Sequence, residues 1–182
     1  MYLINGQLHT ECSLDSALHQ LQRELPRRLQ IPLQTSTLLA TAKAFAERLQ
    51  QEETELPLAP GQREALIDFC QPAALQAKLD RELGLRPESL RRIDYRQSRF
   101  ERWSPLGLVV HITPANAPLL AFCAVIESLL SGNVNWLRPS SSDAGFTARL
   151  LQALVACDPS GQLNGYVAVL PTRTEQIGQL CK

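Results

Sequence analysis

Two short turns carry the side chains of this 182-residue chain that could do chemistry. In the first, residues 113–116 follow a β-branched run, and Asn116 stands where a helix should begin. A side-chain amide in such a place can donate a hydrogen bond to a developing oxyanion. Asparagine is also a preferred N-cap residue, so simple helix capping by Asn116 is the alternative interpretation.

The second turn covers residues 138–143, where Arg138 ends another β-rich run and three serines follow. An arginine beside hydroxyl groups at a helix N-terminus suits a phosphate or ribose, because free N–H groups and the helix dipole favour anions there. The alternative is that Ser142 caps the helix while Arg138 is solvated. Neither GxGxxG nor GxxxxGK[ST] occurs, so the usual dinucleotide and P-loop motifs are missing.

The first hundred residues are predicted to be helical with little strand. Ser13 is expected to cap a helix that Pro26 ends, and Ser36 to cap a second one. Pro72 should separate two further short helices, and Gly84 should end the later one. We therefore expect a helical amino-terminal region over residues 1–100.

The pattern changes near residue 105, where short β-branched runs begin to alternate with apolar helices. Strands are predicted over residues 107–112, 134–138 and 166–170, and helices over residues 119–131, 146–157 and from 174 onward. This alternation predicts parallel strands joined by right-handed crossovers. The expected fold is α/β, with half of a Rossmann-like parallel sheet in residues 101–182. We also expect truncation before a catalytic domain, since no further strand follows.

The composition of the chain argues against several classes of function. Eighteen basic residues balance eighteen acidic ones, which argues against nucleic acid as a partner. Five dispersed cysteines without a CxxC pair suggest a reducing cytoplasm. Residues 106–130 are apolar, but Pro114, Pro118 and Glu127 argue against a membrane span. The three histidines show no metal-ligand spacing, so no metal is predicted.

Single residues with reactive side chains have structural interpretations as well. His111 lies inside a predicted strand and is expected to be a hydrogen-bonded structural residue. A serine hydrolase would need the GxSxG turn, which the sequence lacks. Buried, inert thiols are predicted for Cys70, Cys123 and Cys157, whereas Cys181 is expected to be exposed.

Two longer motifs carry a family resemblance. PLGLVVHITPANAPL at residues 105–119 and GNVNWLRPS at residues 132–140 resemble the paired PxGxVxxIxPxNxPL and GNxxxxKPS motifs of aldehyde dehydrogenases. Within that superfamily, His111, Ala115 in place of the common tryptophan and the serine run are most similar to the acyl-CoA reductase family. That family includes the fatty acid reductase of bacterial luminescence.

The resemblance implies roles for the matching positions. Asn116 would help to hold the oxyanion of a thiohemiacetal. The arginine at the motif lysine position would contact the adenosine ribose, and residues 112–115 would lie along the nicotinamide half. The cofactor-binding positions are Ile112, Thr113, Pro114, Ala115, Arg138, Ser140 and Ser141. Ser141 stands where NAD-preferring members have a glutamate, and Arg138 can pair with a 2′-phosphate. This predicts NADPH over NADH.

The implied reaction is reduction of a fatty acyl-CoA, or of another acyl-enzyme donor, to the aldehyde through a cysteine acyl-enzyme. The nucleophilic cysteine is expected beyond Lys182, and an acyl-protein synthetase is a candidate partner of a homo-oligomeric full-length enzyme. Two alternatives stay open: a non-catalytic remnant or binding module, and a coenzyme A-acylating aldehyde dehydrogenase.

Overall fold

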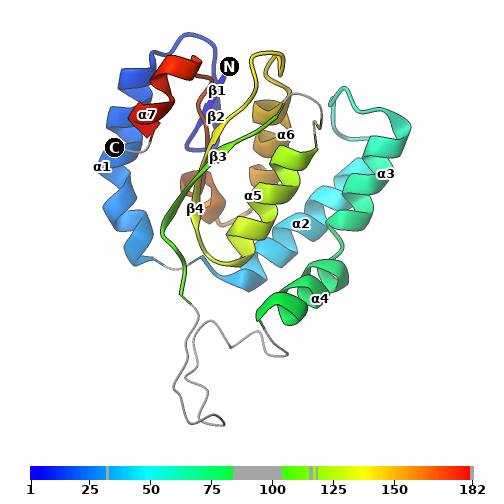
Figure 1. Cartoon of the computed structure of the whole chain (residues 1–182). Coiled ribbons are helices and arrows are strands. Elements are labelled where there is room, and N and C mark those ends of the chain that lie inside the picture. The colour runs from blue at the N-terminus through cyan, green and yellow to red at the C-terminus, as the bar shows by residue number, and fades with distance from the viewer. Residues whose placement is uncertain (32, 84–103, 115–116, 118, 181–182) are drawn as a thin grey trace, which may run out of the picture.

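A five-stranded sheet lies between two groups of helices in the computed structural model, which describes residues 1–31, 33–83, 104–114, 117 and 119–180. Helices α1 (Leu14–Gln30) and α7 (Ile177–Leu180) lie on one side of the sheet in Figure 1, and α5 (Leu120–Leu130) and α6 (Phe146–Val155) on the other. Helices α2 (Thr35–Gln50), α3 (Pro60–Phe69) and α4 (Pro72–Leu83) form an outer layer, in which α2 contacts both α5 and α6.

The carboxyl-terminal half forms the predicted β–α units. Strands β3 (Leu108–Ile112), β4 (Val134–Arg138) and β5 (Val167–Val169) pair in parallel, with Ile112 opposite Arg138 and Leu137 opposite Val169. A short 3-10 helix, η2 (Gln162–Gly165), precedes β5, and another, η3 (Thr174–Gln176), leads into α7. The α/β prediction is therefore confirmed, and the ends of β3 and β4 lie side by side.

The amino terminus corrects the expectation of little strand in the first hundred residues. Strands β1 (Tyr2–Ile4) and β2 (Gln7–His9) form a hairpin whose two-residue turn is Asn5-Gly6. Both turn residues have positive φ, 49° and 76°, as this kind of turn requires. Leu3 pairs antiparallel with Val169, so the sheet order is β2-β1-β5-β4-β3 and the sheet is mixed.

The helix boundaries agree with the sequence in part. Ser13 caps α1 by accepting a hydrogen bond from the Ser16 N–H at 3.2 Å, and Pro72 separates α3 from α4 as predicted. Pro26 does not end α1, which continues to Gln30. The Tyr166 hydroxyl donates a shared hydrogen bond to the carbonyl oxygens of Arg28 and Ile31, and this tertiary contact stabilises the end of α1. Helix α2 begins at Thr35 without a side-chain cap, so the Ser36 prediction is wrong.

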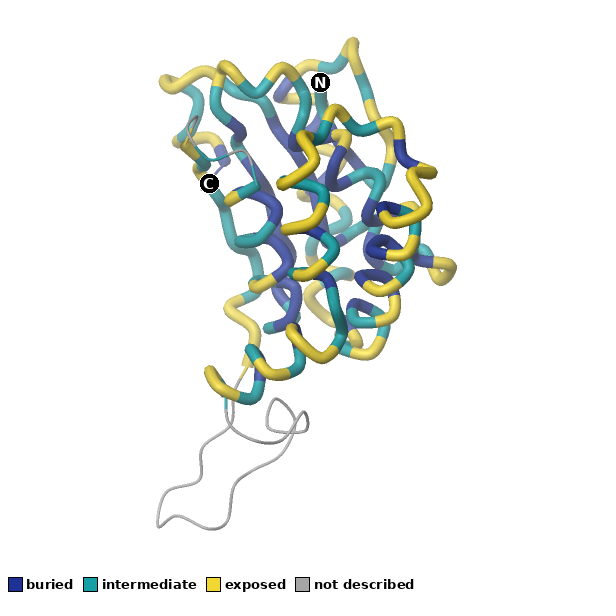
Figure 2. Tube along the Cα trace, turned by 90° about the vertical axis from the view of Figure 1, so that its right-hand side faces the viewer, coloured by how far each residue is buried: buried dark blue, intermediate teal, exposed yellow. Residues whose placement is uncertain are grey.

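One buried core runs through the sheet and the helices on both sides of residue 100. Figure 2 shows buried residues along the strands and on the inward helix faces, with exposed residues outside. Phe122 of α5 contacts Phe45 of α2 and Phe69 of α3, with ring centroids 5.7 and 6.4 Å apart. These aromatic contacts attach the amino-terminal helices to the layer that covers the sheet.

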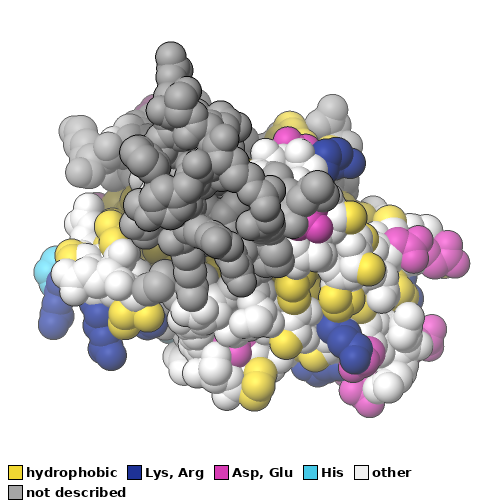
Figure 3. Space-filling view, turned by 90° about the horizontal axis from the view of Figure 1, so that it is seen from below, with side chains coloured by type: hydrophobic (Ala, Val, Ile, Leu, Met, Phe, Trp, Pro, Cys, Tyr) yellow, Lys and Arg dark blue, Asp and Glu magenta, His cyan; other side chains and the backbone are white. Residues whose placement is uncertain are grey.

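The outer surface carries charges of both signs. On the face shown in Figure 3, basic and acidic side chains both occur around the rim, and neither sign forms a continuous patch. Within the described part of the chain, no helix is both long and apolar enough to cross a membrane.

Candidate cofactor-binding site

The carboxyl ends of the parallel strands bring the two predicted turns to one edge of the sheet. Ile112 ends β3 and Arg138 ends β4, and the Thr113 N–H extends the ladder by donating to the Arg138 carbonyl at 3.2 Å. Residues 171–176 follow β5 at the same edge. Ligands bind open α/β sheets at this edge, so the position of the turns fits a binding site.

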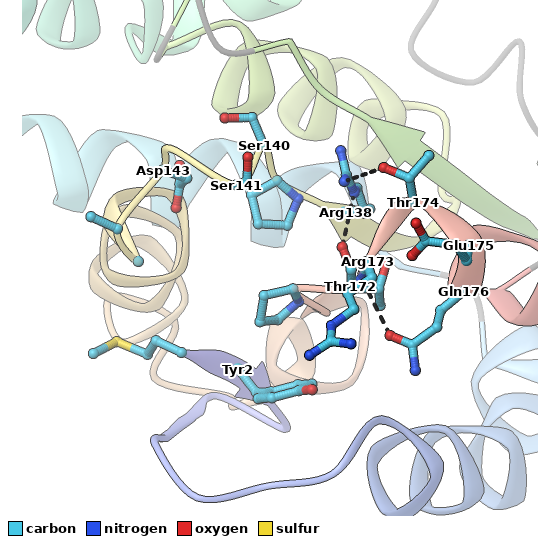
Figure 4. Close-up of a pocket in the computed structure, with 15 residues that line it drawn as sticks. Tyr2, Arg138, Ser140, Ser141, Asp143, Thr172, Arg173, Thr174, Glu175 and Gln176 are labelled. Atoms are coloured by element: carbon cyan, nitrogen blue, oxygen red, sulfur yellow. Dashed lines mark hydrogen bonds between the residues drawn. The ribbon is translucent and has the colours of Figure 1, made fainter.

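A cavity of about 670 Å³ lies beyond the ends of β4 and β5. Three of the predicted cofactor-binding residues, Arg138, Ser140 and Ser141, line it. The opposite walls come from Tyr2 of the hairpin and from the segment after β5, which contributes Arg173 (Figure 4). The structure thus joins residues from three separate parts of the sequence around one space.

Arg138 is held in place by uncharged groups. Its Nε donates to the Thr172 carbonyl at 3.3 Å, and its Nη2 donates to the Thr174 hydroxyl at 3.4 Å (Figure 4). The interpretation of Arg138 as a freely solvated side chain is therefore wrong. Since neither partner is a carboxylate, the positive charge of the guanidinium stays available to an anion in the cavity.

The serine turn leaves its hydroxyls at the surface of the site. The Ser140 and Ser142 hydroxyls lie 2.8 Å apart, and the Ser142 N–H donates to the Ser140 hydroxyl at 3.3 Å. Helix α6 begins only at Phe146, and Asp143 accepts from the Thr147 N–H at 3.2 Å and from the Thr147 hydroxyl at 2.5 Å. The carboxylate of Asp143, rather than the hydroxyl of Ser142, therefore accepts a hydrogen bond from a free N–H group in the first turn of α6.

A smaller cavity of about 200 Å³ lies between the two turns. Thr113 and Pro114 line it together with Ser140 and Ser142. That residues 112–115 lie along the nicotinamide half of the cofactor stays a prediction. Ile112 is 55% exposed and lines neither of these cavities. Ala115 and Asn116 lie outside the described residues, so the oxyanion and capping interpretations of Asn116 both stay predictions.

The asparagines of the second motif hold the strands in place. The Asn133 side-chain oxygen accepts from the backbone N–H groups of Leu106 and Gly107, at 2.7 and 3.2 Å, and so ties the start of β3 to the turn before β4. Gly132 has a φ of +81°, and a Cβ there would lie 3.1 Å from Pro105. Glycine fits this position because it tolerates positive φ and has no Cβ.

His111 has the structural role that the sequence predicts. Its Nε2 lies 2.9 Å from the side-chain oxygen of Asn135, which is fully buried in β4. The Asn135 amide in turn donates to the Asn133 carbonyl at 2.8 Å. The pair thus joins β3 to β4 a few residues before the strand ends that carry the site.

None of the described cysteines lines either cavity. Burial raises the pKa of the Cys70 thiol to about 12, with a smaller contribution from Cys123 and Cys157, so this thiol is inert at neutral pH. Burial, followed by the Glu127 carboxylate, also raises the pKa of Cys123. Cys123 and Cys157 are only half-buried, which corrects the prediction for these two. Cys181 lies outside the described residues, and among those described no cluster of histidine, cysteine and acidic side chains could hold a metal ion.

The sequence reasoning missed the segment after β5. Thr172, Arg173 and Glu175 all line the larger cavity, but no motif pointed to them. Their signal was positional: the third predicted strand should end at the same edge of the sheet as the other two. Tyr2 was missed because the hairpin that carries it was not predicted.

This fold is aldehyde dehydrogenase-like. The chain is similar over 98% of its length to methylmalonate-semialdehyde dehydrogenase from Oceanimonas doudoroffii, with 21% identity and a TM-score of 0.65. It is also similar over 98% of its length to lactaldehyde dehydrogenase from Escherichia coli, with 17% identity and a TM-score of 0.61. The chain spans 42% and 43% of the lengths of these two proteins.

The family can be stated more narrowly. The model of the acyl-CoA reductase (LuxC) family matches residues 32–181, and the chain belongs to this family of oxidoreductases. None of the curated proteins compared with the chain matches it. Among solved structures, the NADP-dependent glyceraldehyde-3-phosphate dehydrogenase from Bacillus halodurans, complexed with NADP, is 19% identical over 91% of this chain and 36% of its own, with a TM-score of 0.52.

Proposed function

We propose that the protein to which this chain belongs reduces a fatty acyl-CoA, or another activated acyl group, to the fatty aldehyde with NADPH, and that this chain forms the cofactor-binding part. The observation that carries the proposal is the cavity at the ends of β4 and β5, in which Arg138 and Ser141 share one wall. Family membership supports the reaction class, since acyl-CoA reductase is the family's own description.

The preference for NADPH is proposed from the side chains around Arg138. The Ser141 hydroxyl stands where a carboxylate would repel a 2′-phosphate, and it is exposed at the cavity. Arg138 is fixed by two neutral oxygens, so its guanidinium is oriented before the cofactor arrives. A preorganised cation beside a small hydroxyl favours a phosphate over a free ribose hydroxyl.

Each part of the site has its own task in the proposed reaction. When bound, NADPH supplies the hydride that reduces the acyl group. Thr113 and Pro114 form the wall of the smaller cavity that lies next to the end of β3. Asn116 is proposed to donate a hydrogen bond to the oxyanion of the thiohemiacetal. The acyl group is carried by a cysteine thiolate that displaces the thiol of coenzyme A. We propose that this cysteine is none of those described here, because none of them reaches the cavities.

Cofactor binding tests the proposal directly. Calorimetric titration of the folded chain should give tighter binding of NADPH than of NADH. Arg138→Ala should weaken NADPH binding by about tenfold or more, because a hydrogen bond to a charged group contributes roughly 1.5–3 kcal/mol.

Arg81→Ala is the matched control, since Arg81 lies on α4 and lines neither cavity. This variant should bind both cofactors as the unchanged chain does. Equal or tighter binding of NADH, or no binding of either cofactor to a chain whose circular dichroism shows it to be folded, would contradict the proposal.

A further inference from the structure

Arg173 lies in the wall of the larger cavity, on the segment that follows β5. Its backbone N–H donates to the Gln176 side chain at 3.3 Å and so fixes the start of η3. Its guanidinium is exposed and makes no hydrogen bond or ion pair with any described residue. Figure 4 shows the Arg173 side chain on the side of the cavity where Tyr2 lies, away from the guanidinium of Arg138.

The cavity therefore holds two arginines without a carboxylate partner. Arg138 is bonded only to neutral oxygens, and Arg173 is unpaired within the described part of the chain. Two acidic side chains also line the cavity. The carboxylate of one, Asp143, already accepts hydrogen bonds from the N–H and hydroxyl of Thr147 at the start of α6. Glu175 is the remaining carboxylate, and it lies on the same segment as Arg173. The two arginines favour the binding of an anion in the cavity, whereas the carboxylate of Glu175 disfavours it.

The sheet order decides which part of a dinucleotide would reach Arg173. The turn after β3 lines the smaller cavity, and β4 separates β3 from β5. Residues after β5 consequently lie farther than Arg138 from the turn assigned to the nicotinamide half. A ligand that extends from that turn past Arg138 would place its adenosine ribose near Arg173. A phosphate on that ribose is the anion that a guanidinium fork binds best.

We propose that Arg173 is a specificity-determining residue that binds the 2′-phosphate of NADPH from a different wall of the cavity than Arg138. This inference rests on the proposed function, because it assumes that the cavity takes a nicotinamide dinucleotide. Tyr2 lines the cavity on the hairpin side and would limit the extent of the ligand there. Glu175 limits the strength of the site by repelling the same phosphate.

The test compares two nucleotides that differ only in the place of the phosphate, 2′-AMP and 5′-AMP, beside NADPH and NADH. Arg173→Ala should weaken binding of 2′-AMP and NADPH by about tenfold or more, and leave 5′-AMP and NADH within about twofold. Arg173→Lys should restore part of the loss, since lysine keeps the charge but not the planar fork. Glu175→Gln should tighten binding of 2′-AMP and leave 5′-AMP unchanged.

The outcomes separate this inference from the proposed function. Suppose that the unchanged chain prefers NADPH, but Arg173→Ala weakens the binding of NADPH and NADH equally or weakens the binding of neither. The role of Arg173 is then overturned, while the proposed function stands. If the unchanged chain does not prefer NADPH, both are overturned. Because Arg173 is exposed, its replacement should not unfold the chain, and the circular dichroism of each variant checks this.

Discussion

Replacing Phe122 with alanine is expected to lower the free energy of unfolding by about 3–5 kcal/mol. Phe122 is fully buried and lies between the sheet-covering helix α5 and the rings of Phe45 and Phe69. The loss combines the buried apolar area of the ring with the cavity that its removal leaves. Aromatic contacts with the two neighbouring rings add to it.

Urea unfolding measures this loss with two signals. In a Trp103→Phe background, fluorescence of Trp136, which is buried in β4, reports mainly on the sheet, and far-ultraviolet circular dichroism reports mainly on the helices. Both transitions should move together, because one core joins the outer helices to the sheet. Phe122→Leu is the control and should cost clearly less, since it keeps most of the apolar volume. A shift in the dichroism alone would mean that the outer helices unfold separately.

Replacing Asn135 with alanine is expected to cost about 2–3 kcal/mol, although only one polar side chain is lost. Asn135 is fully buried, and its amide donates to the Asn133 carbonyl at 2.8 Å. This fixes the orientation of the amide, so its oxygen accepts from the His111 Nε2–H at 2.9 Å. The substitution leaves the buried Asn133 carbonyl without this hydrogen bond and removes the acceptor of the His111 N–H, and an unsatisfied buried group costs more than a hydrogen bond gains.

A double-mutant cycle isolates this pair. His111→Ala should cost less than Asn135→Ala, because His111 lies on the edge strand and is only half-buried. The double variant should lose less stability than the sum of the two single losses, since each single change already breaks the shared hydrogen bond. Strictly additive losses would show that the pair does not couple β3 to β4.

The β–α units could be predicted from the sequence because their signals are local. Runs such as Val167–Val169 are short and apolar and are followed closely by a proline, and the apolar helices between the strands have the usual length. The hairpin carried an equally local signal, Asn5-Gly6 between two short runs, but strands of three residues show too little alternation to be recognised by periodicity.

Most of the errors have tertiary causes, and one is local. Pro26 is a sound signal for a helix end, yet the Tyr166 hydroxyl, distant in sequence, holds the turn beyond it. Ser142 is a good capping residue, but α6 begins four residues later, at Phe146, and Asp143 accepts a hydrogen bond from the Thr147 N–H. Arg173 was missed since its importance depends on which strand ends meet at the edge of the sheet. Motifs identified the first two turns, and only the topology identifies the third.

Hydrogen exchange of the folded chain with and without saturating NADPH tests the central claim most directly, because it reports where the cofactor lies. We predict slower exchange of backbone amides in the two segments that line the larger cavity, residues 138–145 and 172–176, and no change in α3 and α4. Slower exchange confined to α3 and α4, or binding that leaves both segments unchanged, would contradict the assignment of this strand edge as the NADPH site.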